Sequence, residues 1–135
     1  DEAALKTSAF NMQLDVLAKM VPSSKGRSSG GNDPYLSEME TILNRMKHSQ
    51  NRLQKPDIYT YVTMMNAYAK RSNGNEIMVE CAIDLLSQMK KLYHDGDSNV
   101  KPNMQLITSY VDALSKGGRI QHAEQFVLWL EDHYR

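Results

Sequence analysis

The chain has 135 residues, of which 41% are hydrophobic and 24% are charged, and this composition is typical of one globular domain. Its 16 lysines and arginines balance 16 aspartates and glutamates, which excludes strong attraction of the whole chain to nucleic acid or acidic membranes through net charge. The single cysteine, Cys81, excludes an internal disulfide and a cysteine-based zinc site. No apolar run approaches the roughly 20 residues that span a bilayer, so no membrane insertion is expected.

Short motifs that contain proline or glycine divide the chain into segments. In chain order they are Asp33-Pro34, Lys55-Pro56-Asp57, Asn73-Gly74, Lys101-Pro102-Asn103 and Gly117-Gly118. Residues 21–32, rich in serine and glycine, are predicted to form a loop between the first two helices. Because no segment alternates apolar and polar residues as a strand does, the sequence predicts an all-α fold of about six helices.

Two apolar patterns alternate along the chain, and each of them recurs three times. One has the spacing i, i+4, i+7, i+8 and is followed directly by a lysine. Its members are Phe10, Leu14, Leu17 and Ala18 before Lys19; Tyr61, Met65, Tyr68 and Ala69 before Lys70; and Ile107, Val111, Leu114 and Ser115 before Lys116. The other has the spacing i, i+3, i+4, i+7 in Met39, Ile42, Leu43 and Met46, in Ala82, Leu85, Leu86 and Met89, and in Ala123, Phe126, Val127 and Leu130. Both spacings place the apolar residues on one face of an α-helix.

The alternation predicts three antiparallel helical hairpins, in residues 1–57, 58–103 and 104–135. A single hairpin of this size is too small to bury its apolar stripes, so we expect the three to stack as a short α-solenoid, a superhelix of hairpins. The first helices of the hairpins would line one wall and the second helices the other. Equivalent buried positions between hairpins are then predicted for Leu43, Leu86 and Val127.

These segments resemble the pentatricopeptide repeat. The likeness is carried by Lys101-Pro102-Asn103 with ITSYVDALSKGGRIQHAEQFVLWL (107–130), by KPDIYTYVTMMNAYAK (55–70) with CAIDLLSQM (81–89), and by SAFNMQLDVLAK (8–19) with residues 39–46. The units here are longer than those of the family, with the excess in the turns. The resemblance implies binding of single-stranded RNA, one base per repeat, in mitochondria or plastids. Because the chain begins with Asp1 rather than Met, we expect a matured product or part of a longer protein, with the third repeat truncated at Arg135.

The resemblance also assigns roles to particular residues. The base-reading residues carried over are Asn11 with Asp57, Val62 with Asn103, and Thr108. The base-sandwiching residues are Ser8, Tyr59 and Gln105, and the phosphate-contacting residues are Lys19, Lys70 and Lys116. The pair of Asn11 and Asp57 resembles the family's uracil-reading pair, whereas the side chain of Val62 cannot form a hydrogen bond with a base.

Several of these residues could also serve the fold alone, without RNA. Asp57 and Asn103 directly precede predicted helices, where a short polar side chain caps exposed N–H groups. The three lysines lie at the ends of predicted helices, where the helix dipole favours a cation. The ring of Tyr59 could stack on a base or cover the start of its own helix.

No pattern for catalysis is present. The histidines are scattered, without a second ligand at metal-binding spacing; they are His48, His94, His122 and His133. There is neither a Gly-rich phosphate loop nor a nucleophile motif, and Cys81 is expected to be a buried or half-buried thiol without a reactive role. The sequence therefore predicts a protein that is not an enzyme and holds no cofactor or metal.

The sequence leaves two functions open. The leading one is binding of single-stranded RNA in organellar RNA metabolism or translation, with positioning and protection of a transcript and no chemistry. The alternative is a structural subunit of a large organellar assembly such as a ribosome, which would contact protein more than RNA. The neutral net charge and the presence of Val62 at a reading position favour the alternative.

Overall fold

The computed structural model describes residues 6–23 and 33–133, and the regular structure in these residues is entirely helical. The α-helices are α1 (Thr7–Met20), α2 (Pro34–His48), α3 (Ile58–Lys70), α4 (Glu76–His94), α5 (Met104–Lys116) and α6 (Ile120–His133), with the short 3₁₀ helices η1 (Arg52–Gln54) and η2 (Ser98–Val100). The prediction of an all-α fold is confirmed. Most of the predicted loop 21–32 lies outside the described residues, as do residues 1–5 and 134–135.

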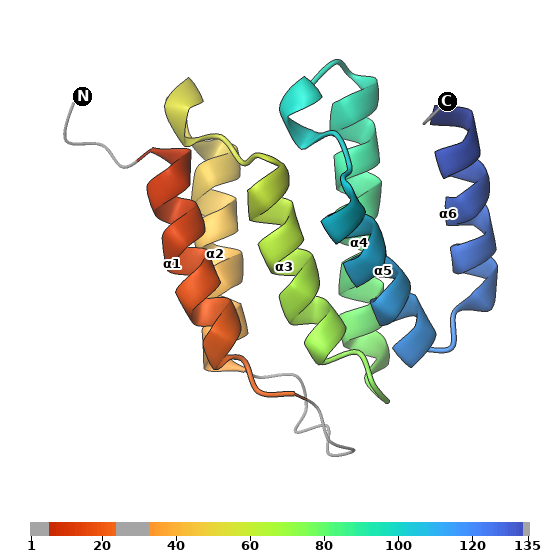
Figure 1. The fold of residues 1–135 in the computed structure, drawn as a ribbon. Coiled ribbons are helices and arrows are strands. Elements are labelled where there is room, and N and C mark those ends of the chain that lie inside the picture. Colours follow the sequence, from red (N-terminus) through yellow and green to blue (C-terminus); the bar gives the residue numbers. More distant parts are fainter. Residues whose placement is uncertain (1–5, 24–32, 134–135) are drawn as a thin grey trace.

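The helices form two layers (Figure 1). In one layer α3 packs between α1 and α5, and we call the surface that these three helices form the first-helix wall. Each of them is followed by an antiparallel partner that it contacts, so that α1 pairs with α2, α3 with α4 and α5 with α6. The described chain is therefore a row of three helical hairpins.

Three of the helices, α2, α3 and α5, begin at the proline motifs. The Asp33 carboxylate accepts hydrogen bonds from the N–H groups of Tyr35 at 2.8 Å and Leu36 at 3.1 Å, with Pro34 as the first residue of α2. This cap satisfies two N–H groups that the helix itself cannot, and the fixed φ angle of proline suits the first helical position. Asn103 caps α5 with its side chain in a similar way.

The core is one continuous cluster in which methionine and leucine dominate. Its fully buried members include Leu14, Met39, Met46, Met64, Met65, Met89, Leu106 and Leu114. Leu43 and Leu86 are buried, as predicted, but Val127 is 49% exposed, so the prediction that it is buried is wrong. The reason is that its face of α6 needs a following hairpin to cover it, and no helix follows α6 in the described residues.

Polar contacts tie the first hairpin to the second where α2 begins and α3 ends. Nη1 of Arg71 lies 3.7 Å from Oδ2 of Asp33, both side chains are buried, and Nη1 also donates to the carbonyl of Pro22 at 3.3 Å. Because a lone buried charge is costly, this pair fixes the two helix ends relative to each other. At the next junction Gly117 lets α5 approach α4 closely, since a Cβ there would lie 2.4 Å from Cγ2 of Val79.

Replacement of Leu86 tests the packing of the middle hairpin. The Leu86→Ala variant is expected to lose about 2–5 kcal/mol of unfolding free energy, because it leaves a cavity in the buried cluster. The matched variant Val127→Ala, at a half-exposed position, should lose less than about 1 kcal/mol. Urea denaturation followed by circular dichroism measures both values, and equal losses would contradict the difference in burial.

Three buried tyrosines make the unfolding free energy fall at alkaline pH. Burial, with a smaller contribution from the charge of Asp97, raises the pKa of Tyr61 from 10.0 to about 12. Burial likewise raises the pKa of Tyr110 to about 12. The pKa of Tyr68 is raised by burial and by the hydrogen bond that its hydroxyl donates to Oε2 of Glu40 at 2.6 Å. All three phenols therefore keep their protons to higher pH in the folded chain than in the unfolded chain.

The contribution of these phenols to the unfolding free energy should be fully present below about pH 10 and fall as the pH rises toward about 12. The unfolded chain releases these protons first, and each tyrosine contributes a slope of at most about 1.4 kcal/mol per pH unit. Urea denaturation at a series of pH values measures the slope. In the Tyr110→Phe variant the slope should be smaller by the contribution of one phenol. A slope equal to that of the wild-type chain would be inconsistent with the raised pKa of Tyr110.

Candidate nucleic-acid interface

A groove of about 550 Å³ lies on the first-helix wall between α3 and α5. Its lining contains four of the residues that the pentatricopeptide resemblance assigns to RNA, namely Tyr59, Val62, Gln105 and Thr108. Tyr59 lies in the first turn of α3 and is 61% exposed, so its ring is accessible to a ligand. Val62 is buried and supplies an apolar part of the lining, while Gln105 and Thr108 are exposed on α5. The groove therefore gathers an exposed aromatic ring and polar side chains from two neighbouring hairpins.

Another predicted pair, Asn11 and Asp57, meets in a slot between α1 and α3. Nδ2 of Asn11 donates to Oδ1 of Asp57 at 3.0 Å, and the hydroxyl of Thr60 donates to Oδ1 of Asn11 at 2.6 Å. Oδ1 of Asp57 also accepts from the N–H group of Thr60 at 3.1 Å and thereby caps α3. The two side chains thus share one slot, and they are bonded to each other and to the helix cap. None of these contacts uses Oδ2 of Asp57.

Ser8 and Asn103 take up other positions. Ser8 is exposed in the first turn of α1. Asn103 accepts a hydrogen bond from the N–H group of Leu106 at 2.9 Å and caps α5. The residue that the resemblance pairs with Asn103 is Val62, which has no polar group to share a hydrogen bond. The α3/α5 groove therefore has an apolar side chain where the α1/α3 slot has the amide of Asn11.

Two of the three predicted phosphate-contacting lysines bind carbonyl groups of the neighbouring hairpin. Nζ of Lys70 donates to the carbonyl of Ala18 at 2.8 Å and to that of Val21 at 3.4 Å. Nζ of Lys116 donates to the carbonyl of Ala69 at 3.2 Å. Each acceptor lies at the C-terminal end of the preceding first helix, where carbonyls lack partners within the helix. The two lysines therefore fasten successive hairpins together.

Sequence reasoning missed this fastening role, although its signal is present in the repeat. The acceptor residues Ala18 and Ala69 directly precede Lys19 and Lys70 in the sequence. The carbonyl acceptor and the lysine donor therefore occupy adjacent positions of the repeat, although each bonded pair joins two successive hairpins.

Lys19 and Lys116 each form an ion pair with the aspartate four residues earlier on the same helix, with Nζ 3.1 Å from Oδ2 of Asp15 and of Asp112. Lys19 differs in its exposure, since its side chain is 77% exposed and that of Lys116 is 36% exposed. It is the lysine of this set best placed to reach an external ligand.

The other reactive side chains give no indication of chemistry in the described part of the chain. Cys81 is half-buried, and burial together with the charges of Glu40, Asp84 and Glu80 raises the pKa of its thiol. A raised pKa keeps the thiol protonated and a poor nucleophile. Among the described residues no group of three or more histidines, cysteines and acids is arranged to hold a metal ion. None of the described helices is both long and apolar enough to cross a membrane.

A comparison with curated proteins finds a relative in Arabidopsis thaliana, a pentatricopeptide repeat-containing protein. It is 36% identical over 92 residues, which are 68% of this chain and 17% of the relative. The chain thus matches about a sixth of that protein's length. No protein-family model and no solved structure matches the chain. The similarity supports pentatricopeptide-like helical repeats, in agreement with the all-helical structure.

The fastening role of Lys70 can be tested against Lys19 as a matched control. The Lys70→Met variant keeps the aliphatic stem but removes the donor to two carbonyls, and is expected to lose about 1–2 kcal/mol of unfolding free energy. The Lys19→Met variant removes only an exposed ion pair within one helix and should change the stability by less than about 0.5 kcal/mol. Urea denaturation of both variants provides the comparison. Similar losses in the two variants would argue against a bond between hairpins at Lys70.

Proposed function

We propose that the chain binds single-stranded RNA on the first-helix wall, as a segment of an α-solenoid of pentatricopeptide-type repeats that works in a mitochondrion or plastid. The observation that supports this most directly is the α3/α5 groove, in which Tyr59, Val62, Gln105 and Thr108 come together with the Tyr59 ring exposed. An exposed aromatic ring beside polar side chains is a common way to hold an unpaired base. The similarity to a pentatricopeptide repeat-containing protein supports the same function.

In this proposal a base enters the groove and stacks on the ring of Tyr59, with Gln105 on its other side. Val62 offers an apolar contact, and Thr108 offers a hydroxyl that can donate or accept. In the α1/α3 slot, Asn11 and Asp57 would read uracil by exchanging their mutual hydrogen bond for bonds to the base. The residues position and protect RNA and carry out no reaction. A row of three hairpins holds few bases, so its affinity for RNA should be low.

A second candidate function is that of a structural subunit in a large organellar assembly, where the chain would contact protein. The observation that favours it is the use of Lys70 and Lys116 as donors to carbonyls of the chain itself. These contacts leave fewer amines for phosphate, and the net charge of zero supplies no general attraction to RNA. The two candidates differ in whether the first-helix wall binds RNA at all.

The RNA proposal predicts that Tyr59 contributes strongly to affinity. Loss of base stacking in the Tyr59→Ala variant should weaken binding about fivefold to 150-fold, which corresponds to roughly 1–3 kcal/mol. Fluorescence anisotropy with short labelled homopolymers of U, A, C and G, at low salt, measures the dissociation constants. The matched control is Ile77→Ala, which removes an equally exposed apolar side chain (62%) from α4, outside the first-helix wall.

Two results would contradict the proposal. One is no change in anisotropy with any of the four homopolymers at the highest protein concentration, in conditions where the chain is folded. The other is RNA binding that Tyr59→Ala and Ile77→Ala weaken equally, since binding would then not use the groove. Either result would favour the structural-subunit function instead.

A further inference from the structure

A groove of about 460 Å³ lies between α4 and α6, in the layer of second helices (Figure 1). We call it the α4/α6 groove, and it is lined by Lys90, Lys91, Tyr93, His94, Trp129 and His133. The lining thus combines two lysines, two histidines, a tyrosine and a tryptophan, and none of these described residues carries a carboxylate. Such a lining attracts an anion and offers it flat apolar surface beside the charge.

The ring of Trp129 is held in a column of aromatic side chains along α6. Its centroid lies 6.0 Å from that of Phe126, with the ring planes 12° apart, and 4.6 Å from that of His133, with the planes 23° apart. Nζ of Lys90 lies 5.2 Å from the Trp129 centroid, a distance at which an ammonium group is attracted to an aromatic ring. A cation of α4 is therefore positioned by a ring of α6 in the lining of the groove.

The repeat register shows a related arrangement at the preceding junction of second helices. Lys47 of α2 and Lys90 of α4 each follow the last residue of their apolar stripe, so their positions are equivalent. Gln88 of α4 and Trp129 of α6 each precede the last residue of theirs. Nζ of Lys47 donates to Oε1 of Gln88 at 2.7 Å. At both junctions a lysine of one second helix reaches the same position of the next, and in the α4/α6 groove this position holds a tryptophan.

The positions that line the groove on α6 are exposed in α4 as well, where the row continues. Trp129 and His133 correspond to Gln88 and Leu92. Gln88 is exposed and Leu92 is 36% exposed, although α6 follows α4 in the row. The linkers after α2 and α4 also run to first helices, since η1 contacts α1 and η2 contacts α3. Further hairpins in a longer row would therefore leave the α4/α6 groove accessible.

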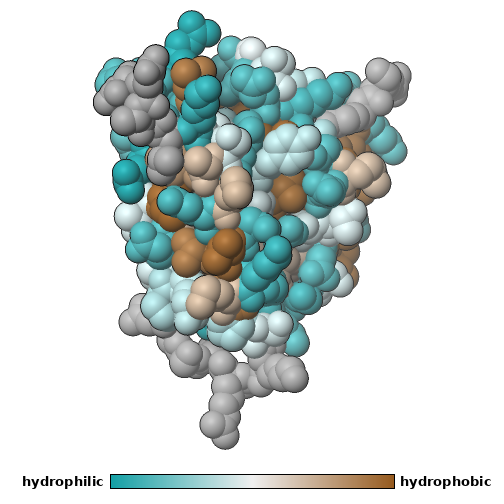
Figure 2. Space-filling view, turned by 60° about the vertical axis from the view of Figure 1, so that its left-hand side comes forward, coloured by the Kyte–Doolittle hydropathy of each residue, from teal (hydrophilic) through white to brown (hydrophobic). Residues whose placement is uncertain are grey.

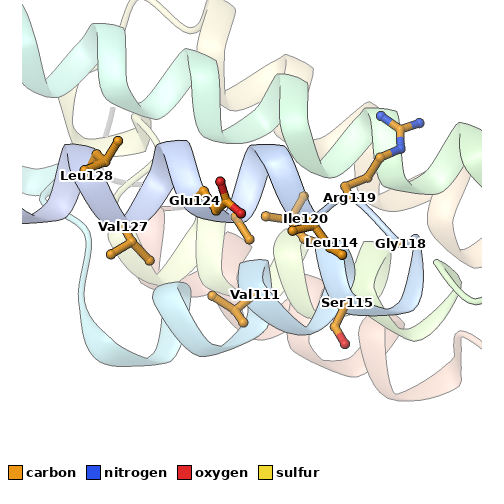
Figure 3. Close-up of a pocket in the computed structure, with 10 residues that line it drawn as sticks. Val111, Leu114, Ser115, Gly118, Arg119, Ile120, Glu124, Val127 and Leu128 are labelled. Atoms are coloured by element: carbon orange, nitrogen blue, oxygen red, sulfur yellow. The ribbon is translucent and has the colours of Figure 1, made fainter.

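Two apolar faces at the ends of the row differ from this groove. Figure 2 turns the α1 end forward and shows apolar side chains along it, and Met12, Val16 and Met20 are exposed on α1. A groove of about 780 Å³ lies between α5 and α6, and Figure 3 shows Val111 and Val127 pointing into it. Further hairpins would pack on both faces, so neither of them identifies a partner.

The charge of its lining distinguishes the α4/α6 groove from the groove between α2 and α4. The latter, of about 300 Å³, is lined by Glu40 and Asp84 as well as by Lys47. The carboxylate of Glu40 accepts a hydrogen bond from the hydroxyl of Tyr68. The α4/α6 groove has two lysines and no carboxylate in its lining, so it attracts an anion although the net charge of the chain is zero.

Two features of the groove favour a peptide over a single strand of RNA. Bases stack on exposed rings, but Trp129 is half-buried and already stacked on two rings, with Lys90 over it. Glu131 and Asp132, in the same turn of α6 as His133, are exposed carboxylates that repel a continuous row of phosphates. A peptide can instead present separate carboxylates to the lysines and place an apolar side chain beside the rings.

We propose that the α4/α6 groove binds an acidic peptide segment of a partner protein. Carboxylates of the segment accept hydrogen bonds from the amines of Lys90 and Lys91, and an apolar side chain packs against the rings of Tyr93 and Trp129. Charge-assisted hydrogen bonds of this kind are stronger than neutral ones and orient the bound segment. The groove belongs to the layer of second helices, so this binding goes beyond the proposed RNA function and does not rest on it.

Trp129 is the only tryptophan of the chain, so its fluorescence reports directly on the groove. The probe is a short synthetic peptide of glutamate and leucine, and its control peptide has glutamine at every glutamate position. Titration of the full chain with the acidic peptide should change the Trp129 emission and reach saturation, whereas the glutamine peptide should leave the emission unchanged. The dissociation constant should rise with the salt concentration, because the contact pairs opposite charges.

The Lys90→Gln variant should raise the dissociation constant of the acidic peptide about fivefold or more, since it removes a charged donor. The matched control is Lys47→Gln, which removes the equivalent lysine from α2 and should change the dissociation constant less than about twofold. Thermal melting followed by circular dichroism checks the fold. Lys91→Gln replaces Lys90→Gln if the latter lowers the melting temperature.

The proposal fails if the acidic peptide leaves the Trp129 emission unchanged, if the glutamine peptide binds equally well, or if Lys47→Gln weakens binding as much as Lys90→Gln. A U homopolymer that displaces the peptide would assign the groove to RNA and would also overturn the proposal. No displacement is expected, because the proposed RNA site lies on the first-helix wall. Absence of RNA binding by the wall would leave the result for the peptide unchanged, so the two proposals fail separately.

Discussion

The burial of α3 between α1 and α5 is the contact on which the rest of the structure depends. Tyr61, Met64, Met65 and Ala67 are all 0% exposed, so the middle of this helix is buried except on the first-helix wall, where Asn66 is exposed. No single hairpin could bury these side chains, because they point toward both neighbours as well as toward α4. Their packing sets the distance between the first helices, and this distance in turn sets the width of the slot and the groove on the first-helix wall.

The packing that builds the wall also uses some of the polar groups that a ligand would need. Asn11 is half-buried and bonded to Asp57, Val62 at the next equivalent position is buried, and Thr108 at the last is exposed. One repeat position thus has three different environments, because a side chain there is shaped by the hairpin that follows it. Equivalence in sequence therefore predicts where a residue lies on the wall, but not whether its polar atoms are already engaged.

The helices and their starting points could be predicted from the sequence because they depend on local rules. Apolar spacing defines a helical stripe, and Asp33 before Pro34 defines a cap, whatever the rest of the chain does. The acceptor of Lys70 could not be predicted in the same way, because the carbonyl of Ala18 is brought to it by tertiary packing. The exposure of Val127 likewise depends on what lies beyond α6 and not on the stripe to which it belongs. The groove contains Tyr59 and Gln105 together because two hairpins lie side by side, and the sequence pointed to these two residues only through the pentatricopeptide resemblance.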